Sequence, residues 1–288
     1  MATDTSKTNS VPRGYTGVRA LGIGTVFEVA LVRDGQGRDL ICKRPARVSS
    51  GVTALALERE RVLLAKLRGF AVPELVESGE DERGGFLVES CARGVPLRDI
   101  VGGEKKISPR ELLGLARVSA AALAELHGAT DDHGALEFVH GDISPDNVFF
   151  ESPDKVTFID LSSALWRDAT SPASPGDRGT APYAAPELLR QESLATQSGD
   201  TYALAATLLA VATGAPIVRA TNDAGRLYEA GTEGVLWRGL DECVDLDPGF
   251  RAAIAEALQY EQGQRLASSR ELAARLGPLS NHGSHRHE

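Results

Sequence analysis

The hydrophobic pattern of the chain changes near residues 91–94. Before this point, residues 15–88 contain short runs of β-branched and apolar residues separated by glycine-rich turns, such as TVFEVALV, RDGQGRD and LICK. This pattern is typical of β-hairpins. After residue 97 apolar residues recur at helical spacing, so we predict an α+β fold in which a small β-rich lobe and a larger helical lobe enclose a cleft. The expected boundaries are a flexible tail over 1–12, the first lobe over 13–92, the second lobe over 93–278 and a flexible tail over 279–288.

The charge of the chain argues against broad contact with anionic partners. A net charge of -9 and a pI near 5.3 would repel phosphate, so we expect no nucleic-acid binding and no anionic membrane partner. The longest nearly apolar run, 202–212, is much shorter than the ~20 residues that span a bilayer, and we expect a cytoplasmic protein. The cysteines lie far apart without a CxxC motif, which predicts neither a disulfide framework nor a zinc site: Cys42, Cys91 and Cys243.

The stretch FVHGDISPDNVFF, residues 138–150, places polar side chains between short apolar runs. The turn-forming sequence ESPDK follows it and precedes a second apolar run, which predicts an antiparallel hairpin. Asn147 and Asp160 would then lie side by side, roughly 5 Å apart, and could share one Mg²⁺. Asp142, on the preceding loop, would be free to orient and deprotonate a hydroxyl group. The alternative is a turn closed by Asx caps.

A second polar pair is predicted between a strand and a helix. Lys43 ends the strand LICK, and in the following helical segment Glu60 shares an apolar stripe with Leu57 and Leu64, whereas Glu58 does not. A carboxylate on a buried face needs a cation. We therefore predict that Lys43 pairs with Glu60 and reaches phosphate groups; the alternative is a surface lysine.

Together these segments resemble the eukaryotic-type serine/threonine protein kinase family, and its bacterial members in particular. LGIGTVFEV resembles the glycine-rich loop, LICK the third strand with its lysine, and ERERVLLAKL the helix with the paired glutamate. HGDISPDN resembles the catalytic loop, IDLS the metal-binding DFG position, and GTAPYAAPE the segment ending in APE. The likeness covers nearly the whole chain. It implies a two-lobed kinase-like fold, ATP with Mg²⁺ or Mn²⁺ as cofactors, and transfer of the γ-phosphate to a protein serine or threonine.

The resemblance implies a role for each matching residue. Asp142 would be the catalytic base, supported by the pair of Lys43 with Glu60, and Asn147 and Asp160 would bind the metal. The residues expected to contact the nucleotide are Gly22, Gly24, Val29, Lys43, Ser90 and Ala92. In this register Glu89 would close the back of the adenine pocket; a one-residue slip would place Val88 there.

The segment after the metal site would form a platform for a protein substrate. Asp200 would bond the catalytic-loop backbone, and Arg265 would form a buried ion pair with Glu187; the alternatives are a helix N-cap and a surface arginine. Thr180 would belong to the same platform. Autophosphorylation sites could be Thr170, Ser171, Ser174 and Thr180.

Six residues depart from the family pattern, and the mildest departure is Leu161 in place of a phenylalanine. Phe27 stands at the third glycine position of the phosphate loop, and Ile41 replaces a small residue over the adenine. Gly141 replaces the arginine that pairs with a phosphorylated loop in many relatives, so we expect activity that does not need this phosphorylation. Ser144 replaces a lysine and Ser162 a glycine. These departures keep open a pseudokinase, and HGD with a downstream asparagine keeps open a small-molecule phosphotransferase of the same fold.

Overall fold

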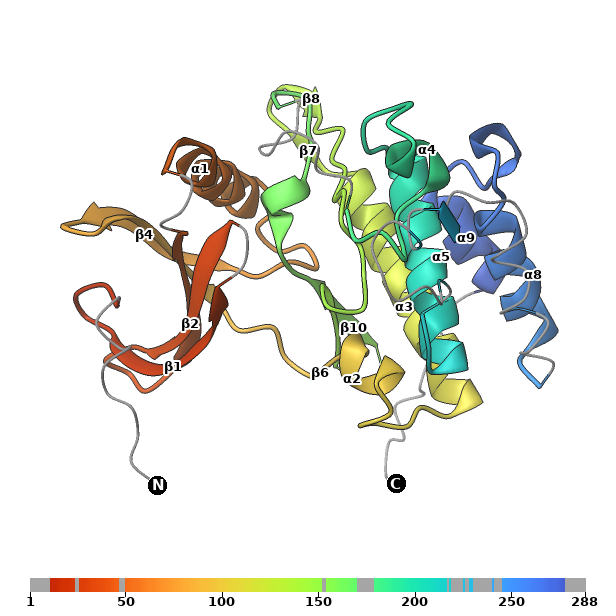
Figure 1. Cartoon of the computed structure of the whole chain (residues 1–288), viewed down its shortest axis with the longest axis horizontal. Coiled ribbons are helices and arrows are strands. Elements are labelled where there is room, and N and C mark those ends of the chain that lie inside the picture. The colour runs from red at the N-terminus through yellow and green to blue at the C-terminus, as the bar shows by residue number, and fades with distance from the viewer. Residues whose placement is uncertain are drawn as a thin grey trace, which may run out of the picture.

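The chain forms two lobes that differ in secondary structure (Figure 1). The computed structural model describes residues 11–23, 26–46, 50–151, 154–169, 179–216, 218, 225, 228–229, 240 and 245–277. A sheet with one helix makes up the first lobe, and a packed set of helices makes up the second. The predicted α+β, two-lobed fold is confirmed.

The first lobe is built on a five-stranded antiparallel sheet with the order β1-β2-β3-β5-β4. Helix α1 packs against β3, β4 and β5. It carries Glu60, as the sequence predicts. The bounds are β1 Thr16–Ile23, β2 Phe27–Arg33, β3 Asp39–Pro45, α1 Ser50–Lys66, β4 Leu75–Asp81 and β5 Gly84–Ser90.

The two faces of this sheet bury different side chains, as expected from the alternation of side chains along a strand. Leu87 of β5 faces α1 and joins the main core of the protein together with Leu57 and Leu64 of that helix. Its neighbour Val88 faces the other way and packs with Phe86 in a small separate cluster on the outer face. Residue 89 therefore returns to the inner face.

The second lobe is mainly helical, and α5 lies buried at its centre. Every residue of α5 from Asp200 to Val211 is buried, because α3, α8 and α9 pack around it. A capping box of Ser108 and Glu111 fixes the start of α3. The helices are α2 Leu97–Val101, α3 Pro109–His127, η2 Leu161–Ser163, α4 Pro186–Leu189, α5 Gln197–Thr213, α8 Pro248–Ala257, η3 Gln262–Gln264 and α9 Ser269–Leu276.

A small sheet lies between the lobes, next to α2 (Figure 1). Its order is β10-β9-β6, and β9 and β10 form the hairpin that the sequence predicts. A further two-stranded ribbon joins β7 to β8. The bounds are β6 Val95–Pro96, β7 Thr130–Asp131, β8 Gly134–Ala135, β9 Val148–Glu151 and β10 Lys155–Phe158.

The chain crosses between the lobes at Gly94, where only glycine fits. Gly94 has φ +88, and a Cβ there would lie 2.1 Å from the carbonyl oxygen of Phe150. Contact at that distance with backbone atoms forces the chain apart. The crossing strand β6 could then no longer pair with β9.

We expect Gly94→Ala to lower the free energy of unfolding by at least about 2 kcal/mol. Gly103→Ala is the matched control, because Gly103 also has a positive φ of +79 but has no atom within 4 Å of the added Cβ. The free energy of unfolding of the control should fall by only about 1 kcal/mol, the cost of a positive φ for alanine. Urea denaturation of both variants measures the difference, and equal losses would contradict the proposed steric role of Gly94.

No helix in the described ranges is long and apolar enough to cross a membrane. Cys42 and Cys91 are free thiols. Cys243 lies outside the described residues.

Candidate active site

A cleft of about 650 Å³ lies between the two lobes. Both lobes supply its walls: Val29 and Lys43 come from the first lobe, and Asn147 and Asp160 come from the β9–β10 hairpin region of the second. Polar residues from segments far apart in the sequence therefore share one cavity.

Lys43 lies at the back of this cleft between two buried carboxylates. Its Nζ is 2.6 Å from Oε1 of Glu60, as the sequence predicts, and 3.0 Å from Oε1 of Glu89. Burial alone would lower the pKa of Lys43, but Glu60 and Glu89 outweigh it and raise that pKa. Burial raises the pKa of Glu60 to about 7 against the opposing effect of Lys43, and it also raises the pKa of Glu89. The lysine is charged and held on both sides.

The hairpin brings Asn147 and Asp160 to the same cleft, but not in the predicted register. The residue opposite Asn147 is Ile159, whose N–H donates to the Asn147 carbonyl oxygen at 2.9 Å. Asp160 is one residue further and has a left-handed backbone with φ 64 and ψ 80. This conformation interrupts the alternation of the strand, so Ile159 and Asp160 both line the cleft. The prediction that residues 147 and 160 lie directly across the ladder is wrong, because the hairpin pairs Val148 with Phe158 and so places Ile159 opposite Asn147.

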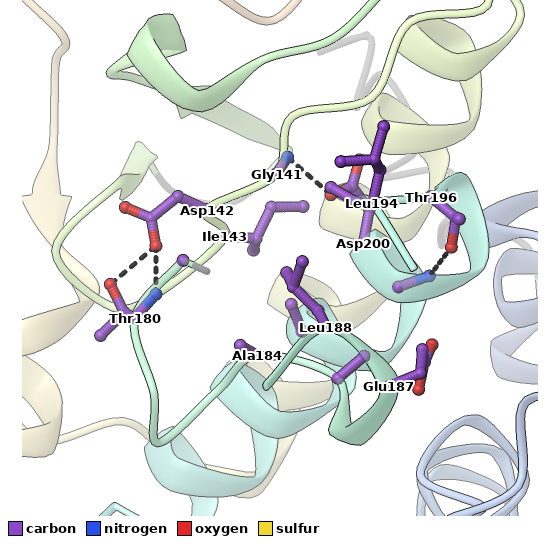
Figure 2. Close-up of a pocket in the computed structure, with 15 residues that line it drawn as sticks. Gly141, Asp142, Ile143, Thr180, Ala184, Glu187, Leu188, Leu194, Thr196 and Asp200 are labelled. Carbon is purple, nitrogen blue, oxygen red and sulfur yellow. Dashed lines mark hydrogen bonds between the residues drawn. The ribbon is translucent and has the colours of Figure 1, made fainter. Parts of the chain in front are cut away.

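The carboxylate of Asp142 is held by hydrogen bonds on both oxygens. Asn147 Nδ2 donates to its Oδ2 at 3.0 Å and to the Asp142 carbonyl oxygen at 2.9 Å. Thr180 donates to Oδ1 from both its backbone N–H and its hydroxyl, each at 2.7 Å, as Figure 2 shows. Burial raises the pKa of Asp142, and the bonds from Thr180 act in the opposite direction. The arrangement fixes the direction of a buried carboxylate.

Asp200 supports the loop that carries Asp142. Its carboxylate accepts the backbone N–H of His140 at 2.7 Å and that of Gly141 at 2.9 Å, and Figure 2 shows the second of these bonds. His127 Nε2 lies 3.0 Å from the same carboxylate. The N-cap of α5 is Thr196, whose side chain accepts the N–H of Gly199. The N-cap alternative for Asp200 is therefore wrong.

Glu187 and Arg265 form a buried two-bond ion pair. The guanidinium donates to the two Glu187 oxygens at 2.8 and 3.0 Å, and none of the Arg265 side chain is exposed. It also donates to the Gln259 and Tyr260 carbonyl oxygens and stacks on Tyr202 at 4.7 Å. The surface-arginine alternative is therefore wrong.

The structure gives a physical reason for glycine at position 141. Gly141 has φ +81, and a Cβ there would lie 2.7 Å from the Ser163 carbonyl oxygen. An arginine could not occupy this position without moving either the segment of residues 140–142 or η2. The backbone of Ser163 occupies the space that a longer side chain at position 141 would need.

The other departures have different consequences. Phe27 is buried, and Lys43 Nζ lies 5.8 Å from its ring centroid. The ring therefore covers one side of the ammonium group. Ile41 lines the cleft on the same side as Lys43, as predicted. Ser144 is fully buried, and its hydroxyl has no hydrogen-bond partner among the described residues. Ser162 is not one of the described residues with positive φ, so the backbone does not require glycine there.

The predicted nucleotide contacts divide into three groups. Val29, Ser90 and Ala92 line the cleft with Lys43. Gly22 pairs with Val29 in the sheet and is exposed, but it is not one of the described residues that line the cleft. Gly24 lies outside the described residues, as do Thr170, Ser171 and Ser174.

Two side chains that shape the site, Glu89 and Arg59, have partners that the sequence does not predict. Glu89 was expected at the adenine pocket, but not as a partner of Lys43. The rule that found Glu60 also applies to Glu89, since it is an acid in the buried strand FLVES. Arg59 donates to the Ala164 carbonyl oxygen at 2.8 Å and stacks on Trp166 at 4.9 Å. It ties α1 to the segment after Asp160, and no local pattern marks it.

Asn147 and Asp160 fit a divalent cation by the chemistry of their donor atoms. The Asn147 amide nitrogen makes both bonds to Asp142, so its amide oxygen is the atom left to bind a metal. Asp160 supplies carboxylate oxygens on the same cleft. The described residues contain no group of three His, Cys, Asp or Glu side chains that could hold a metal. This fits Mg²⁺, which binds through one or two protein ligands and completes its coordination with phosphate and water.

The comparisons with known proteins agree with this geometry. Serine/threonine-protein kinase PknB of Mycolicibacterium smegmatis is 27% identical over 266 residues, which cover 89% of this chain and 41% of the relative. PknB of Mycobacterium tuberculosis strain H37Ra is 27% identical over 276 residues, covering 91% of this chain and 42% of the relative. Serine/threonine-protein kinase AfsK of Streptomyces griseus is 25% identical over 261 residues, covering 90% of this chain and 31% of the relative.

The chain thus spans about two fifths of the length of the PknB relatives. The family model for the protein kinase domain matches residues 15–272. These residues contain both lobes, the cleft between them and every polar pair described above. The chain belongs to the protein kinase domain family.

Proposed function

We propose that this protein is a serine/threonine kinase that transfers the γ-phosphate of ATP to a hydroxyl group of a protein. The observation that carries the proposal is the meeting of Lys43, Asn147 and Asp160 in one cleft, with Asp142 bonded to Asn147. Phosphoryl transfer depends mainly on positioning and charge neutralisation, and these residues supply both.

Each residue has a distinct task in this proposal. Lys43, held by Glu60, neutralises phosphate charge, and Asn147 and Asp160 hold Mg²⁺ or Mn²⁺. When bound, the metal offsets the charge that develops on the phosphate oxygens. Asp142 accepts the proton of the substrate hydroxyl, and Asn147 and Thr180 hold its carboxylate in one orientation. The substrate hydroxyl takes over the position on Asp142 that the Thr180 hydroxyl occupies in this structure.

The activity itself is tested with radiolabelled ATP. Incubation with a generic basic protein and Mg²⁺ or Mn²⁺ should label serine and threonine residues of that protein. Label on the chain itself would identify autophosphorylation, for which Thr180 is the candidate among the described residues. No transfer to either protein with either metal would contradict the proposal.

The metal site predicts a specific effect of Asp160→Asn. Loss of the carboxylate charge should remove the strengthening of ATP binding by Mg²⁺, which we expect to be about tenfold in the wild type. The ATP dissociation constant, measured with and without Mg²⁺ by calorimetry, gives this ratio for both proteins. Asp154→Asn is the control, because Asp154 is exposed and lies directly before β10. An unchanged Mg²⁺ effect in Asp160→Asn would contradict the assignment.

A pseudokinase is the second candidate, and one observation favours it. Lys43 is enclosed by Glu60, Glu89 and Phe27 and is only 6% exposed, so little of the ammonium is open to phosphate. A small-molecule phosphotransferase does not need a peptide platform, and the buried pair of Glu187 with Arg265 counts against that function.

A further inference from the structure

The second carboxylate on Lys43 places two acids against a single cation in the cleft. Lys43 is one cation, and Glu60 and Glu89 are two acids within 3.0 Å of it. The three side chains are 7%, 1% and 4% exposed, so water screens their interactions poorly. One oxygen of each acid, Oε2, is buried and has no hydrogen-bond partner among the described residues. Lys43 alone therefore does not provide a hydrogen bond to every oxygen of the two acids.

The two acids are not equivalent. Glu60 belongs to α1, contacts Lys43 at the shorter distance of 2.6 Å and also accepts the N–H of Leu161 at 3.3 Å. Glu89 belongs to β5, contacts Lys43 at 3.0 Å and lines the cleft. The cavity therefore meets Glu89, whereas Glu60 is fixed behind it between α1 and η2.

A ligand would displace Glu89 rather than Glu60, because Glu89 lines the cleft and Glu60 has a second hydrogen bond, from Leu161. An ammonium group has three N–H donors. Glu60 and Glu89 take up two of them, and the Phe27 ring covers the group at 5.8 Å. Lys43 and Glu89 both line the cleft and lie 3.0 Å apart. A phosphate that binds Lys43 therefore comes close to the Glu89 carboxylate, and two neighbouring anions repel each other.

We propose that Glu89 competes with nucleotide phosphates for Lys43 and thereby limits the affinity of the cleft for phosphorylated ligands. This inference rests on the proposed function, since it takes a nucleoside triphosphate as the ligand. Binding of the phosphates requires Glu89 to leave Lys43 while Glu60 stays. Glu89 is then a residue that sets ligand affinity and takes no part in the chemical step.

Glu89→Gln tests this competition because it removes the charge and keeps the size and an acceptor oxygen. Calorimetry with Mg²⁺·ATP should show about tenfold tighter binding to the variant than to the wild type, equivalent to about 1.4 kcal/mol. Adenosine is the matched ligand: it has no phosphate, so its affinity should stay the same. Glu80→Gln, which removes an exposed charge from β4 of the same lobe, should change neither affinity.

Three results would overturn the inference: unchanged ATP affinity in Glu89→Gln, weaker ATP binding, or equal strengthening for ATP and adenosine. The last would mean that residue 89 acts on the base or on the space around it. Glu89→Leu removes both charge and acceptor and repeats the test if the first variant unfolds, which a melting curve detects. Absence of ATP and adenosine binding in every protein would instead refute the proposed function together with this inference. Binding of ATP to Glu89→Gln but not to the wild type would support the inference.

Discussion

Replacing Asp142 by asparagine is expected to lower kcat by about 10²- to 10⁴-fold, the range that a positioned general base contributes. The amide cannot take the proton of the substrate hydroxyl. The backbone bond from Asn147 Nδ2 to the residue 142 carbonyl oxygen, at 2.9 Å, does not depend on the side chain. The Asn147 amide, the proposed metal ligand, should therefore stay in place, and the ATP dissociation constant should change by less than about twofold.

The measurement separates chemistry from binding. Initial rates at saturating ATP give kcat, and calorimetry with Mg²⁺·ATP gives the dissociation constant for the same preparation. Asp154→Asn, the same substitution at an exposed residue directly before β10, should leave both values unchanged. Wild-type turnover in Asp142→Asn would refute the assigned base, and a parallel loss of ATP binding would show that Asp142 acts by holding the metal site.

The parts of the site that depend on regular periodicity were predictable from the sequence. Glu60 could be assigned to the buried face of α1 because the spacing of Leu57 and Leu64 fixes that face, and Glu60 is fully buried in the structure. The β9–β10 hairpin follows from two short apolar runs around a turn sequence. Such patterns need only the geometry of one helix or one pair of strands.

Other parts could not be predicted, because they depend on contacts between segments or on an irregular backbone. The left-handed conformation of Asp160 turns its side chain out of the strand alternation, so that it lines the cleft together with Ile159, and no strand pattern contains this change. The bond of Arg59 to the Ala164 carbonyl oxygen joins residues 105 positions apart. The contact of Gly141 with Ser163 depends on the packing of η2 against the segment of residues 140–142. Glu89 differs from these, since the requirement of a buried acid for a cation could have identified its partner.

Replacing Glu187 by glutamine is expected to lower the free energy of unfolding by about 3 kcal/mol. The Arg265 guanidinium has no exposed side-chain surface, and two of its hydrogen bonds go to Glu187. Glutamine has nearly the same shape but no charge, so the variant leaves a cation buried without its counterion. That loss costs far more than breaking an exposed pair. Glu58→Gln provides the control, because Glu58 pairs with Arg61 at the surface of α1. This substitution should lower the free energy of unfolding by less than about 1 kcal/mol.

The Glu187→Gln variant also tests whether the ion pair with Arg265 affects the active site. Glu187 lines the small cavity that contains Asp142 and Thr180, with Ile143 and Leu188 between them in Figure 2. Release of Glu187 from Arg265 should loosen the segment from Thr180 to Leu188 and with it the two bonds that Thr180 makes to Asp142. We therefore expect kcat of Glu187→Gln to fall about tenfold at a temperature well below its melting point, where the variant is folded. Urea denaturation and rate measurements on one preparation test both effects, and a stability loss with wild-type kcat would limit the pair to a structural role.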